Sequence, residues 1–548
     1  MNGRVAGLVA LVTCALLATL ALPASAPAKR GMVTGFAGLE QYQTGPASER
    51  PTWFNRTADA NASMVRLSVG WAGVAGPVRP PDPTNPGNAS YDFSTIDGPV
   101  RDARARGLSV MLTVNVAPTW AEGPNRPADA AEGSWEPSPS DLADFLQAVA
   151  ARYSGGFDPD GAGPTPALPS VQAIEVWDEP NSGDWLTPQF TGKYFAGADH
   201  YRLMLNAAYK AIKSINPAMD VIAAGTDPYG DPPGGPYPAS GARARPVEFW
   251  QHVFCVKPVK AKKKKKSKKP PKVKYVRTAG CSSSVSFDIF AHHPIDNTGG
   301  GPLRSSPNRF DASTPDLGRV VSVLRGAEKV GTASGGHHPV WVTEFWWDSK
   351  PPNPVGAPLK TQARWMEQSL YLFWKAGASL AVNFEIADSS ARPDVRAGQQ
   401  SGVYFQDGRP KPSLQAMQFP FVTERVNKRT LRVWGRSPRR GKLLIQRKQG
   451  GWRTVKKMKV GAGSVFVTKL RLSGKQQLRA VVAGQRSLVW KQAAAVTQSG
   501  SGGGGPSGFV IALIGLAVVA AALAAVLLAR RRTRPRSGGG VTAIFAKG

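Results

Sequence analysis

Residues 171–181 read VQAIEVWDEPN, and this stretch decides the fold that the sequence predicts. Its first seven residues have the largely apolar, β-branched composition of a buried strand. Pro180 ends that strand, because proline has no backbone N–H to donate to a sheet. Glu179 therefore lies where a strand passes into a loop, which is the position at which parallel α/β barrels carry their chemistry.

A second stretch has the same form. Residues 338–347 read HPVWVTEFWW and place Glu344 at the end of another predicted strand, with aromatic residues beyond it. Carboxyl groups are among the side chains that move protons in catalysis. A single glutamate at a strand end is usually a solvated loop residue, but Glu179 and Glu344 together predict an acid–base site.

Strand-like and helix-like segments alternate on both sides of these stretches. Apolar residues recur at i, i+3, i+4 and i+7 over 142–153, which predicts an amphipathic helix. Eight strands are predicted, beginning at residues 32, 63, 108, 171, 220, 286, 340 and 379. This alternation predicts a (β/α)₈ TIM barrel over residues 29–421. A doubly wound open sheet has the same local pattern, and the carboxylates that end strands four and seven favour the barrel.

The two ends of the chain have a different composition. Residues 1–28 combine an arginine, an apolar run and an A-x-A pattern, which predicts a signal peptide. Residues 509–529 are apolar and uncharged over a length that would cross a bilayer as one helix. A Gly/Ser linker at 497–508 precedes this segment, and a basic tail at 530–548 follows it, as on the cytoplasmic side of a membrane. The sequence therefore predicts a single-pass protein of the cell membrane whose barrel is extracellular.

Residues 422–496 consist of short runs that alternate apolar and polar side chains between Gly-rich turns. This pattern predicts a small β-sandwich domain. Such a domain is either a carbohydrate-binding module or a spacer between the barrel and the membrane. We favour the spacer, because no row of aromatic residues extends beyond Trp434, Trp452 and Trp490.

A lysine-rich insertion at 257–277 lies between Cys255 and Cys281. Like charges at this density repel each other, so a disordered loop is predicted there. In an exported protein the two cysteines are expected to form a disulfide. The insertion either binds anionic cell-wall polymers or phospholipid head groups, or has no partner, and these alternatives stay open. The net charge of +32 fits nucleic acid as well, but the predicted export argues against a nucleic-acid partner.

These motifs resemble those of the clan A retaining glycoside hydrolases, the (β/α)₈ enzymes that include families 5, 39 and 51. The resemblance rests on WDEPN and VTEFWW, and it extends to VRLSVGW at the second strand and AHHP after the sixth. It implies that Glu179 is the acid/base and Glu344 the nucleophile in the hydrolysis of a β-linked poly- or oligosaccharide. No metal or cofactor is expected.

The resemblance also implies residues that contact the substrate or the nucleophile. The guanidinium of Arg66 would keep Glu344 ionised, and flat tryptophan faces would stack on sugar rings. His292 and His293 are adjacent and point to opposite sides of a strand, so one of them faces the barrel mouth, and His292 is favoured. The predicted substrate-binding set is Arg66, Trp120, Asp178, His292 and Trp346.

Two positions depart from the family pattern. Asp178 stands where the family has an asparagine, and an ionised aspartate can only accept hydrogen bonds. The eighth strand reads Asn383-Phe384-Glu385 where many relatives have a tryptophan, and Glu385 is a third carboxylate at the lip. Two alternatives to hydrolysis therefore remain: a catalytically weak barrel that binds cell-envelope glycans as an adhesion or scaffold protein, and a transglycosylase.

Overall fold

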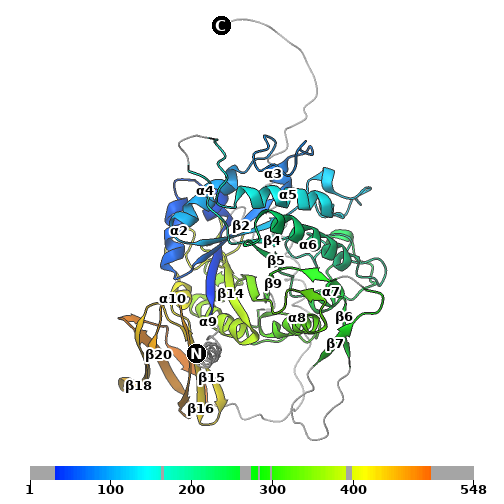
Figure 1. Cartoon of the computed structure of the whole chain (residues 1–548). Coiled ribbons are helices and arrows are strands. Elements are labelled where there is room, and N and C mark those ends of the chain that lie inside the picture. The colour runs from blue at the N-terminus through cyan, green and yellow to red at the C-terminus, as the bar shows by residue number, and fades with distance from the viewer. Residues whose placement is uncertain are drawn as a thin grey trace, which may run out of the picture. The chain divides into compact units, whose positions relative to one another are not determined.

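Eight parallel strands close into a barrel, shown in Figure 1. The computed structural model describes residues 31–161, 166–259, 273–281, 284–296, 299–390 and 398–494. Around the barrel the strands follow the order β1-β14-β11-β9-β5-β4-β3-β2. The barrel strands are β1 (Val33–Ala37), β2 (Met64–Gly70), β3 (Ser109–Asn115), β4 (Ala173–Val176), β5 (Asp220–Ala223), β9 (Ile289–His292), β11 (Val340–Phe345) and β14 (Ala378–Phe384). The predicted barrel is thus confirmed, and the open sheet is excluded because β1 pairs with both β14 and β2.

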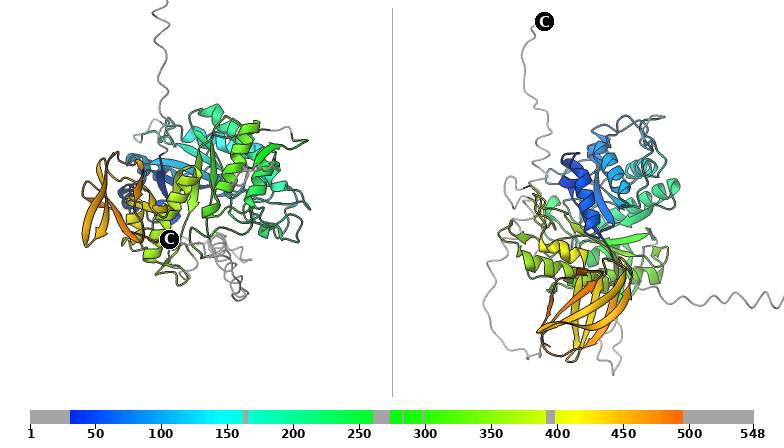
Figure 2. Two further views of the ribbon diagram at one scale, coloured as in Figure 1. Left: turned by 90° about the horizontal axis from the view of Figure 1, so that it is seen from below. Right: turned by 90° about the vertical axis from the view of Figure 1, so that its left-hand side faces the viewer.

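Helices connect the strands and surround the barrel (Figures 1 and 2). In α5, Ser138 caps the first turn by accepting a hydrogen bond from the Asp141 backbone N–H at 3.3 Å, and Pro139 occupies a position where no N–H is needed. The helices are α2 (Arg50–Asp59), α3 (Trp71–Ala75), α4 (Ser94–Ala105), α5 (Pro139–Arg152), α6 (Ala196–Ile215), α7 (Pro246–Val253), α8 (Gly318–Val330), α9 (Leu359–Ala376) and α10 (Pro412–Gln418). Short elements complete the barrel domain: η1 (Glu40–Thr44), η2 (Thr119–Ala121), η3 (Ala239–Gly241), η4 (Thr314–Asp316), β8 (Val285–Ser286), β10 (Ala333–Ser334), β12 (Ser349–Lys350) and β13 (Ala357–Pro358).

An apolar layer fills the inside of the barrel. It is separate from the larger core between the strands and the helices. Because side chains alternate along a strand, the residue two positions further on each strand also points inward, one layer nearer the carboxyl ends. The inner layer consists of Ala37, Met64, Met111, Ala173, Ile222, Ile289, Ala291, Trp341, Leu380 and Val382. This layer is the floor on which the polar groups of the site lie.

Two antiparallel sheets follow the barrel, seen in orange in Figure 2. One sheet has the order β15-β16-β19, and the other has the order β18-β17-β20-β21 with β22 paired to β20. The strands are β15 (Phe421–Asn427), β16 (Thr430–Arg436), β17 (Gly441–Gln449), β18 (Gly451–Val460), β19 (Val465–Arg471), β20 (Gln476–Val482), β21 (Gln485–Arg486) and β22 (Trp490–Gln492). A β-rich region is therefore present from Phe421 on, and the predicted domain limits at 422 and 496 stay predictions.

The two ends of the lysine-rich insertion differ from the prediction. Residues 257–277 were expected to be disordered throughout, but β6 (Val256–Val259) and β7 (Lys274–Arg277) pair as an antiparallel ribbon. Backbone hydrogen bonds between the two arms explain the order, and a disulfide joins Cys255 to Cys281 beside them. Residues 260–272, which carry most of the lysines, lie outside the described residues.

The predicted membrane architecture is corrected. Within the described ranges, no helix has both the length and the apolar character needed to cross a bilayer. The described residues form a (β/α)₈ barrel with a β-rich C-terminal region and contain no membrane-spanning helix. The predicted location in the cell membrane is therefore not supported by them. The segments to which the sequence assigned a signal peptide, linker, membrane helix and basic tail, 1–28, 497–508, 509–529 and 530–548, lie outside the described residues.

Candidate active site

A polar layer lies directly above the apolar floor of the barrel. Arg66, Thr113, Glu175 and Thr343 each follow an inward apolar residue by two positions, so strand alternation turns them inward as well. The Thr113 hydroxyl donates to Glu175 at 2.8 Å, and the Thr343 hydroxyl donates to the other Glu175 oxygen at 2.7 Å. Glu175 is fully buried, and sequence reasoning missed it. The sequence could have indicated this residue, because Glu175 is the only charged residue in the apolar run AIEV.

Arg66 connects this layer to the strand ends. Its guanidinium donates to Asp178 at 2.8 Å and to Glu344 and Glu175 at 3.2 Å each. Burial alone would lower the pKa of Arg66, but the charges of Asp178, Glu175 and Glu344 together raise it. Arg66 is therefore a cation shared by three carboxylates, and its role in keeping Glu344 ionised stays a prediction.

Glu344 is turned toward Arg66 by an irregularity in β11. The register between β11 and β14 shifts between Val342 and Phe345, so that both Thr343 and Glu344 reach the barrel interior. Burial raises the pKa of Glu344 to about 7. His293 and Arg66 oppose this rise, whereas the negative charges of Asp178 and Glu179 add to it.

Glu179 lies in the turn that follows β4. The backbone of Trp177 and Glu179 has positive φ values of 77° and 38°, a conformation that costs energy for residues other than glycine and concentrates at functional sites. The Glu179 N–H donates to the Gly225 carbonyl at 3.0 Å, which ties the turn to the end of β5. Burial raises the pKa of Glu179 well above its usual range, and the charges of Asp227 and Asp178 raise it further.

His293, rather than the favoured His292, lies beside the carboxylates. Its Nδ1 is 3.1 Å from Glu179 Oε1 and its Nε2 is 3.1 Å from Thr343 Oγ1. Thr343 already donates to Glu175, so Thr343 accepts from His293 Nε2–H. A proton therefore lies between His293 Nδ1 and Glu179. Gly225 makes room for the ring, because a Cβ at this position would approach the His293 ring to 2.2 Å.

His292 points away from the site. Its Nδ1 is 2.8 Å from Thr226 Oγ1, and its Nε2 is 2.6 Å from the Ala312 carbonyl oxygen. Burial lowers the pKa of His292 to about 3, so this ring is neutral. Side chains alternate along β9, and Ile289 and Ala291 both point into the barrel. The next residue on the same side is 293, so this alternation could have predicted that His293 faces the site.

The predicted tryptophans are not brought to the carboxylates by any described contact. The Trp120 ring packs edge-on against Trp71 at 5.7 Å, and its Nε1 donates to the Gly76 carbonyl at 3.1 Å. These contacts place Trp120 in the packing of the loop around α3. Trp346 is half-buried, two residues after Glu344.

Several charged residues near Glu179 escaped the sequence analysis. Arg243 lies 3.3 Å from Asp184 and 3.9 Å from Asp227, and Asp227 chiefly raises the pKa of Arg243. These residues come from loops without a periodic pattern.

Glu385, the third lip carboxylate, is 5% exposed and accepts from the Ser389 hydroxyl, and burial raises its pKa to about 8. Among the described residues, no group of three or more His, Cys, Asp or Glu side chains is placed to hold a metal ion.

Comparison of the sequence with protein-family profiles and with curated proteins gives no match. The fold is similar to that of a family 39 glycoside hydrolase from Bacteroides cellulosilyticus WH2, with 16% identity, a TM-score of 0.44 and 81% of each chain covered. It is similar to a glucosidase from Croceicoccus marinus, with 14% identity and a TM-score of 0.45 over 82% of this chain and 95% of that one. It is also similar to a GH30 endoxylanase from Clostridium papyrosolvens C71, with 10% identity and a TM-score of 0.39, and the match covers 81% of this chain and 94% of that one.

Family 39, one of the families that the motifs resemble, is also the family of one of these similar structures.

Proposed function

We propose that the chain is a retaining glycoside hydrolase that cleaves a β-linked poly- or oligosaccharide. One observation supports the proposal: Glu344 and Glu179 both lie at the mouth of the barrel, but in different surroundings. The guanidinium of Arg66 contacts Glu344 as well as Asp178, whereas Glu179 contacts the imidazole of His293. Retaining hydrolysis needs one carboxylic acid and one carboxylate on either side of the glycosidic bond.

Glu344 is the proposed nucleophile. Its contact with Arg66 at 3.2 Å favours the ionised form, and the same contact aims one carboxylate oxygen. The free oxygen would attack the anomeric carbon and form a covalent glycosyl-enzyme as the glycosidic bond breaks.

Glu179 is the proposed acid/base. Burial and two neighbouring aspartates favour its protonated form, which is the form that can donate a proton to the leaving oxygen. Glu179 would then accept a proton from the water that hydrolyses the glycosyl-enzyme. Thr343 holds the His293 ring in place at 3.1 Å.

Asp178 and Arg66 are proposed to contact the sugar next to the scissile bond. One Asp178 oxygen accepts from Arg66 at 2.8 Å, which leaves the other free to accept from a substrate hydroxyl. Trp346 and Trp120 stay proposals as stacking surfaces, and His292 is not part of the proposed site.

A glycan-binding barrel without turnover is the second candidate. The observation that favours it is Asp178, which adds a negative charge beside both glutamates and so opposes ionisation of the nucleophile. A transglycosylase would use the same residues for transfer to a sugar instead of water.

The deciding experiment compares hydrolysis of a panel of aryl β-glycosides and β-glucans by the wild type, Glu344→Ala, Glu179→Ala and Glu385→Ala. We expect Glu344→Ala to lose on the order of 10⁵-fold in kcat, and Glu179→Ala to regain turnover with azide or with a good leaving group. Glu385→Ala should retain most activity, and a larger loss there than at Glu344 would move the nucleophile to Glu385.

Absence of turnover on every substrate, with glycan binding unchanged in all variants, would refute the enzyme and leave the binding barrel. Transfer products in the presence of a sugar acceptor would identify a transglycosylase.

A further inference from the structure

Asp178 lies next to both glutamates of the candidate site. Its Oδ1 accepts from Arg66 at 2.8 Å, and the same guanidinium contacts Glu344 at 3.2 Å. In the chain Asp178 directly precedes Glu179. The negative charge of Asp178 adds to the rise in the pKa of each glutamate, as expected of a group close to both. A sugar that reaches both glutamates therefore also reaches Asp178.

The carboxylate of Asp178 is open to such a sugar. Its side chain is 13% exposed, close to the 18% of Glu179 and the 14% of Glu344. Its second oxygen, Oδ2, accepts no hydrogen bond from the described residues, and it is not one of the enclosed polar atoms that lack a partner. Oδ2 is therefore in reach of a bound donor.

The chemistry of a glycoside identifies that donor. The nucleophile attacks the anomeric carbon C1, whose neighbours in the ring are the ring oxygen and C2. The ring oxygen has no hydrogen, so the group on C2 is the nearest donor for a carboxylate that lies beside both glutamates. This group is a hydroxyl in a neutral hexose and an ammonium in a 2-amino sugar.

Negative charge exceeds positive charge around the two glutamates. Three carboxylates share the guanidinium of Arg66, and two more lie beside that of Arg243. The five carboxylates are Glu175, Asp178, Asp184, Asp227 and Glu344. Even with Glu179 protonated and a charge on His293, these five carboxylates face three positive charges among the described residues. An ammonium offsets part of the excess, whereas a hydroxyl does not.

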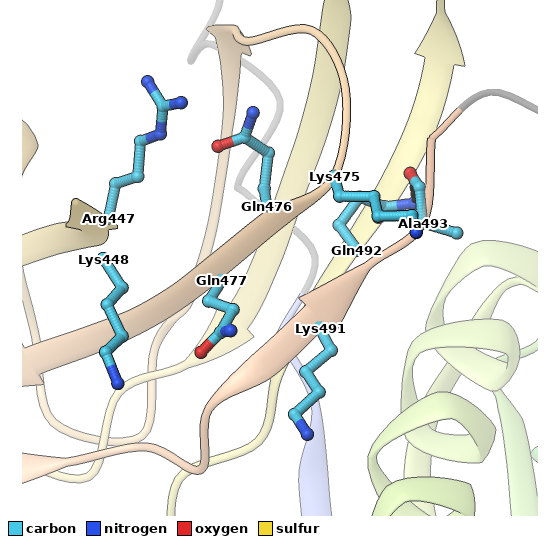
Figure 3. A pocket seen from close by; sticks show the side chains of 8 residues that line it. All are labelled: Arg447, Lys448, Lys475, Gln476, Gln477, Lys491, Gln492 and Ala493. Carbon is cyan, nitrogen blue, oxygen red and sulfur yellow. Dashed lines mark hydrogen bonds between the residues drawn. The ribbon is translucent and has the colours of Figure 1, made fainter. Parts of the chain in front are cut away.

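This acidic mouth contrasts with the rest of the chain, whose net charge is +32. Figure 3 shows an open hollow at β17, β20 and β22 that has four cationic residues and no acidic residue in its lining. The cationic residues are Arg447, Lys448, Lys475 and Lys491. In the part of the chain that the structure describes, no three carboxylates or imidazoles are placed to hold a metal ion. The charge at the mouth therefore fits an organic cation better than an inorganic one.

We propose that Asp178 selects a 2-amino sugar, so that the substrate is a β-linked glycan in which the sugar at the cleaved bond carries a free ammonium on C2. This inference rests on the proposed glycoside hydrolysis. The ammonium donates to Asp178 Oδ2 while Oδ1 keeps its contact with Arg66.

The ammonium also removes an obstacle to the proposed reaction. Burial raises the pKa of Glu344 to about 7, and the charge of Asp178 adds to this rise and so opposes ionisation of the nucleophile. His293 and Arg66 act in the opposite direction. A bound ammonium adds a further positive charge and favours the carboxylate that attacks C1.

The test measures kcat/KM of the full chain at pH 7 for two aryl β-glycosides that differ only at C2, the glucosaminide and the glucoside. Asp178→Asn keeps an oxygen that can accept from Arg66 and removes the charge. We expect it to lower the ratio of glucosaminide to glucoside kcat/KM at least about tenfold. Both substrates meet the same glutamates, so the ratio cancels changes in the pKa values of these groups. Asp184→Asn, which also removes one charge near Glu179, is the matched control and should change the ratio less than about threefold.

The pH dependence supplies a readout that a purely structural role of Asp178 would not move. The profile of kcat/KM reports the free protein, and that of kcat reports the complex with substrate. For the glucosaminide we expect the acid limb of kcat at lower pH than that of kcat/KM, because the bound ammonium favours ionised Glu344. For the glucoside the two limbs should coincide. Melting temperatures check that each variant is folded.

Binding separates this inference from the proposed hydrolysis. Glu344→Gln prevents turnover, and its affinities for the same two glycosides are compared with and without Asp178→Asn. Binding of the glucosaminide at least about tenfold tighter than the glucoside, only with Asp178 present, would support selection of the amino sugar even if no glycoside is hydrolysed.

Three results would overturn the inference. Hydrolysis of both glycosides with a ratio that Asp178→Asn leaves unchanged would keep the glycosidase and remove the selection. A preference for the N-acetylglucosaminide that is lost in Asp178→Asn would assign the contact to a neutral amide N–H. Failure of Glu344→Gln to bind the glucosaminide, or binding that does not depend on Asp178, would show that the ammonium does not meet this carboxylate.

Discussion

Two glutamates of the candidate site must hold opposite protonation states for the proposed reaction. Burial raises the pKa of Glu344 to about 7 and that of Glu179 well above its usual range. Because an ionised nucleophile is lost as the pH falls through its pKa, we expect kcat/KM to decline below about pH 7, and to decline on the alkaline side only above the raised pKa of Glu179. Assays from pH 5 to 10 measure this profile, and an acid limb near pH 4.5 would contradict the assignment.

Asp178 raises the pKa of both glutamates, so its charge should shift the whole profile. Removing that charge in Asp178→Asn should lower both pKa values and move both limbs to lower pH. Asp184→Asn is the matched control, because Asp184 raises the pKa of Glu179 and is not among the groups that shift Glu344. We expect the control to move the alkaline limb alone. Identical shifts in the two variants would refute the separate roles of the glutamates.

The adjacent histidines offer a pair of variants with opposite expectations. His293→Gln removes the contact with Glu179 and a group that lowers the pKa of Glu344. We expect a loss of about 10²–10³-fold in kcat and an acid limb at higher pH. His292→Gln removes buried hydrogen bonds to Thr226 and Ala312, so it should lower the melting temperature without moving the pH profile. A shifted profile in His292→Gln would contradict this division.

The sequence could predict the residues at the strand ends better than their surroundings. The strand was expected to reach Pro180, but β4 ends at Val176 and Glu179 lies in the turn that follows it. Glu344 lies next to Arg66, and the roles predicted for these residues stay predictions. His292 was favoured wrongly, although strand parity argued for His293. Asp227 and Arg243 could not be found, because they come from loops whose course depends on the folded barrel.

Among the elements, strands were predictable where apolar runs were long. All eight barrel strands were found, since each is buried on both sides and has a continuous apolar pattern. The register shift in β11 that turns Glu344 inward left no pattern in the sequence. The ribbon of β6 and β7 was missed because its lysines suggested disorder, whereas backbone pairing stabilises its two arms.

Helix α9 carries a buried acid where it meets β15. Glu367 is 1% exposed and accepts from the Phe421 N–H at 3.2 Å, and burial raises its pKa to about 8. Its protonated form therefore stabilises the fold below about pH 4.5, and this contribution is lost as the pH rises through about 8. We expect Glu367→Gln to match the wild type at pH 5 and to exceed it by up to a few kcal/mol at pH 9, measured by denaturant unfolding.

Glu424 on β15 is the control for this prediction, because its pKa is shifted the other way. Burial alone would raise the pKa of Glu424, but hydrogen bonds from Lys375 and Tyr371 lower it. Its contribution is present above the unfolded pKa and is lost as the pH falls through the folded pKa. Glu424→Gln should therefore destabilise the protein at pH 7 and not at low pH. A gain in stability at pH 9 in both variants would show that net charge, and not burial, is responsible.

The barrel and the C-terminal sheets belong to one compact unit with a continuous hydrophobic core. Trp434 of β16 is 1% exposed, and its ring lies 5.6 Å from that of Tyr371 and 6.1 Å from that of Trp374, both on α9. A core shared in this way should melt as a unit, because neither part can lose its side of the interface without exposing the other.

We therefore expect one calorimetric transition for the full chain, and we expect Trp434→Ala to lower its temperature without splitting it, at a cost of about 3–5 kcal/mol. Trp452→Ala is the comparison, since this tryptophan is half-buried on β18 beside Arg479 and is not a member of the shared core. Two transitions in the wild type, only one of them shifted by Trp434→Ala, would show instead that the sheets fold independently. In that case the β-rich region could be produced alone, and its stability measured without the barrel.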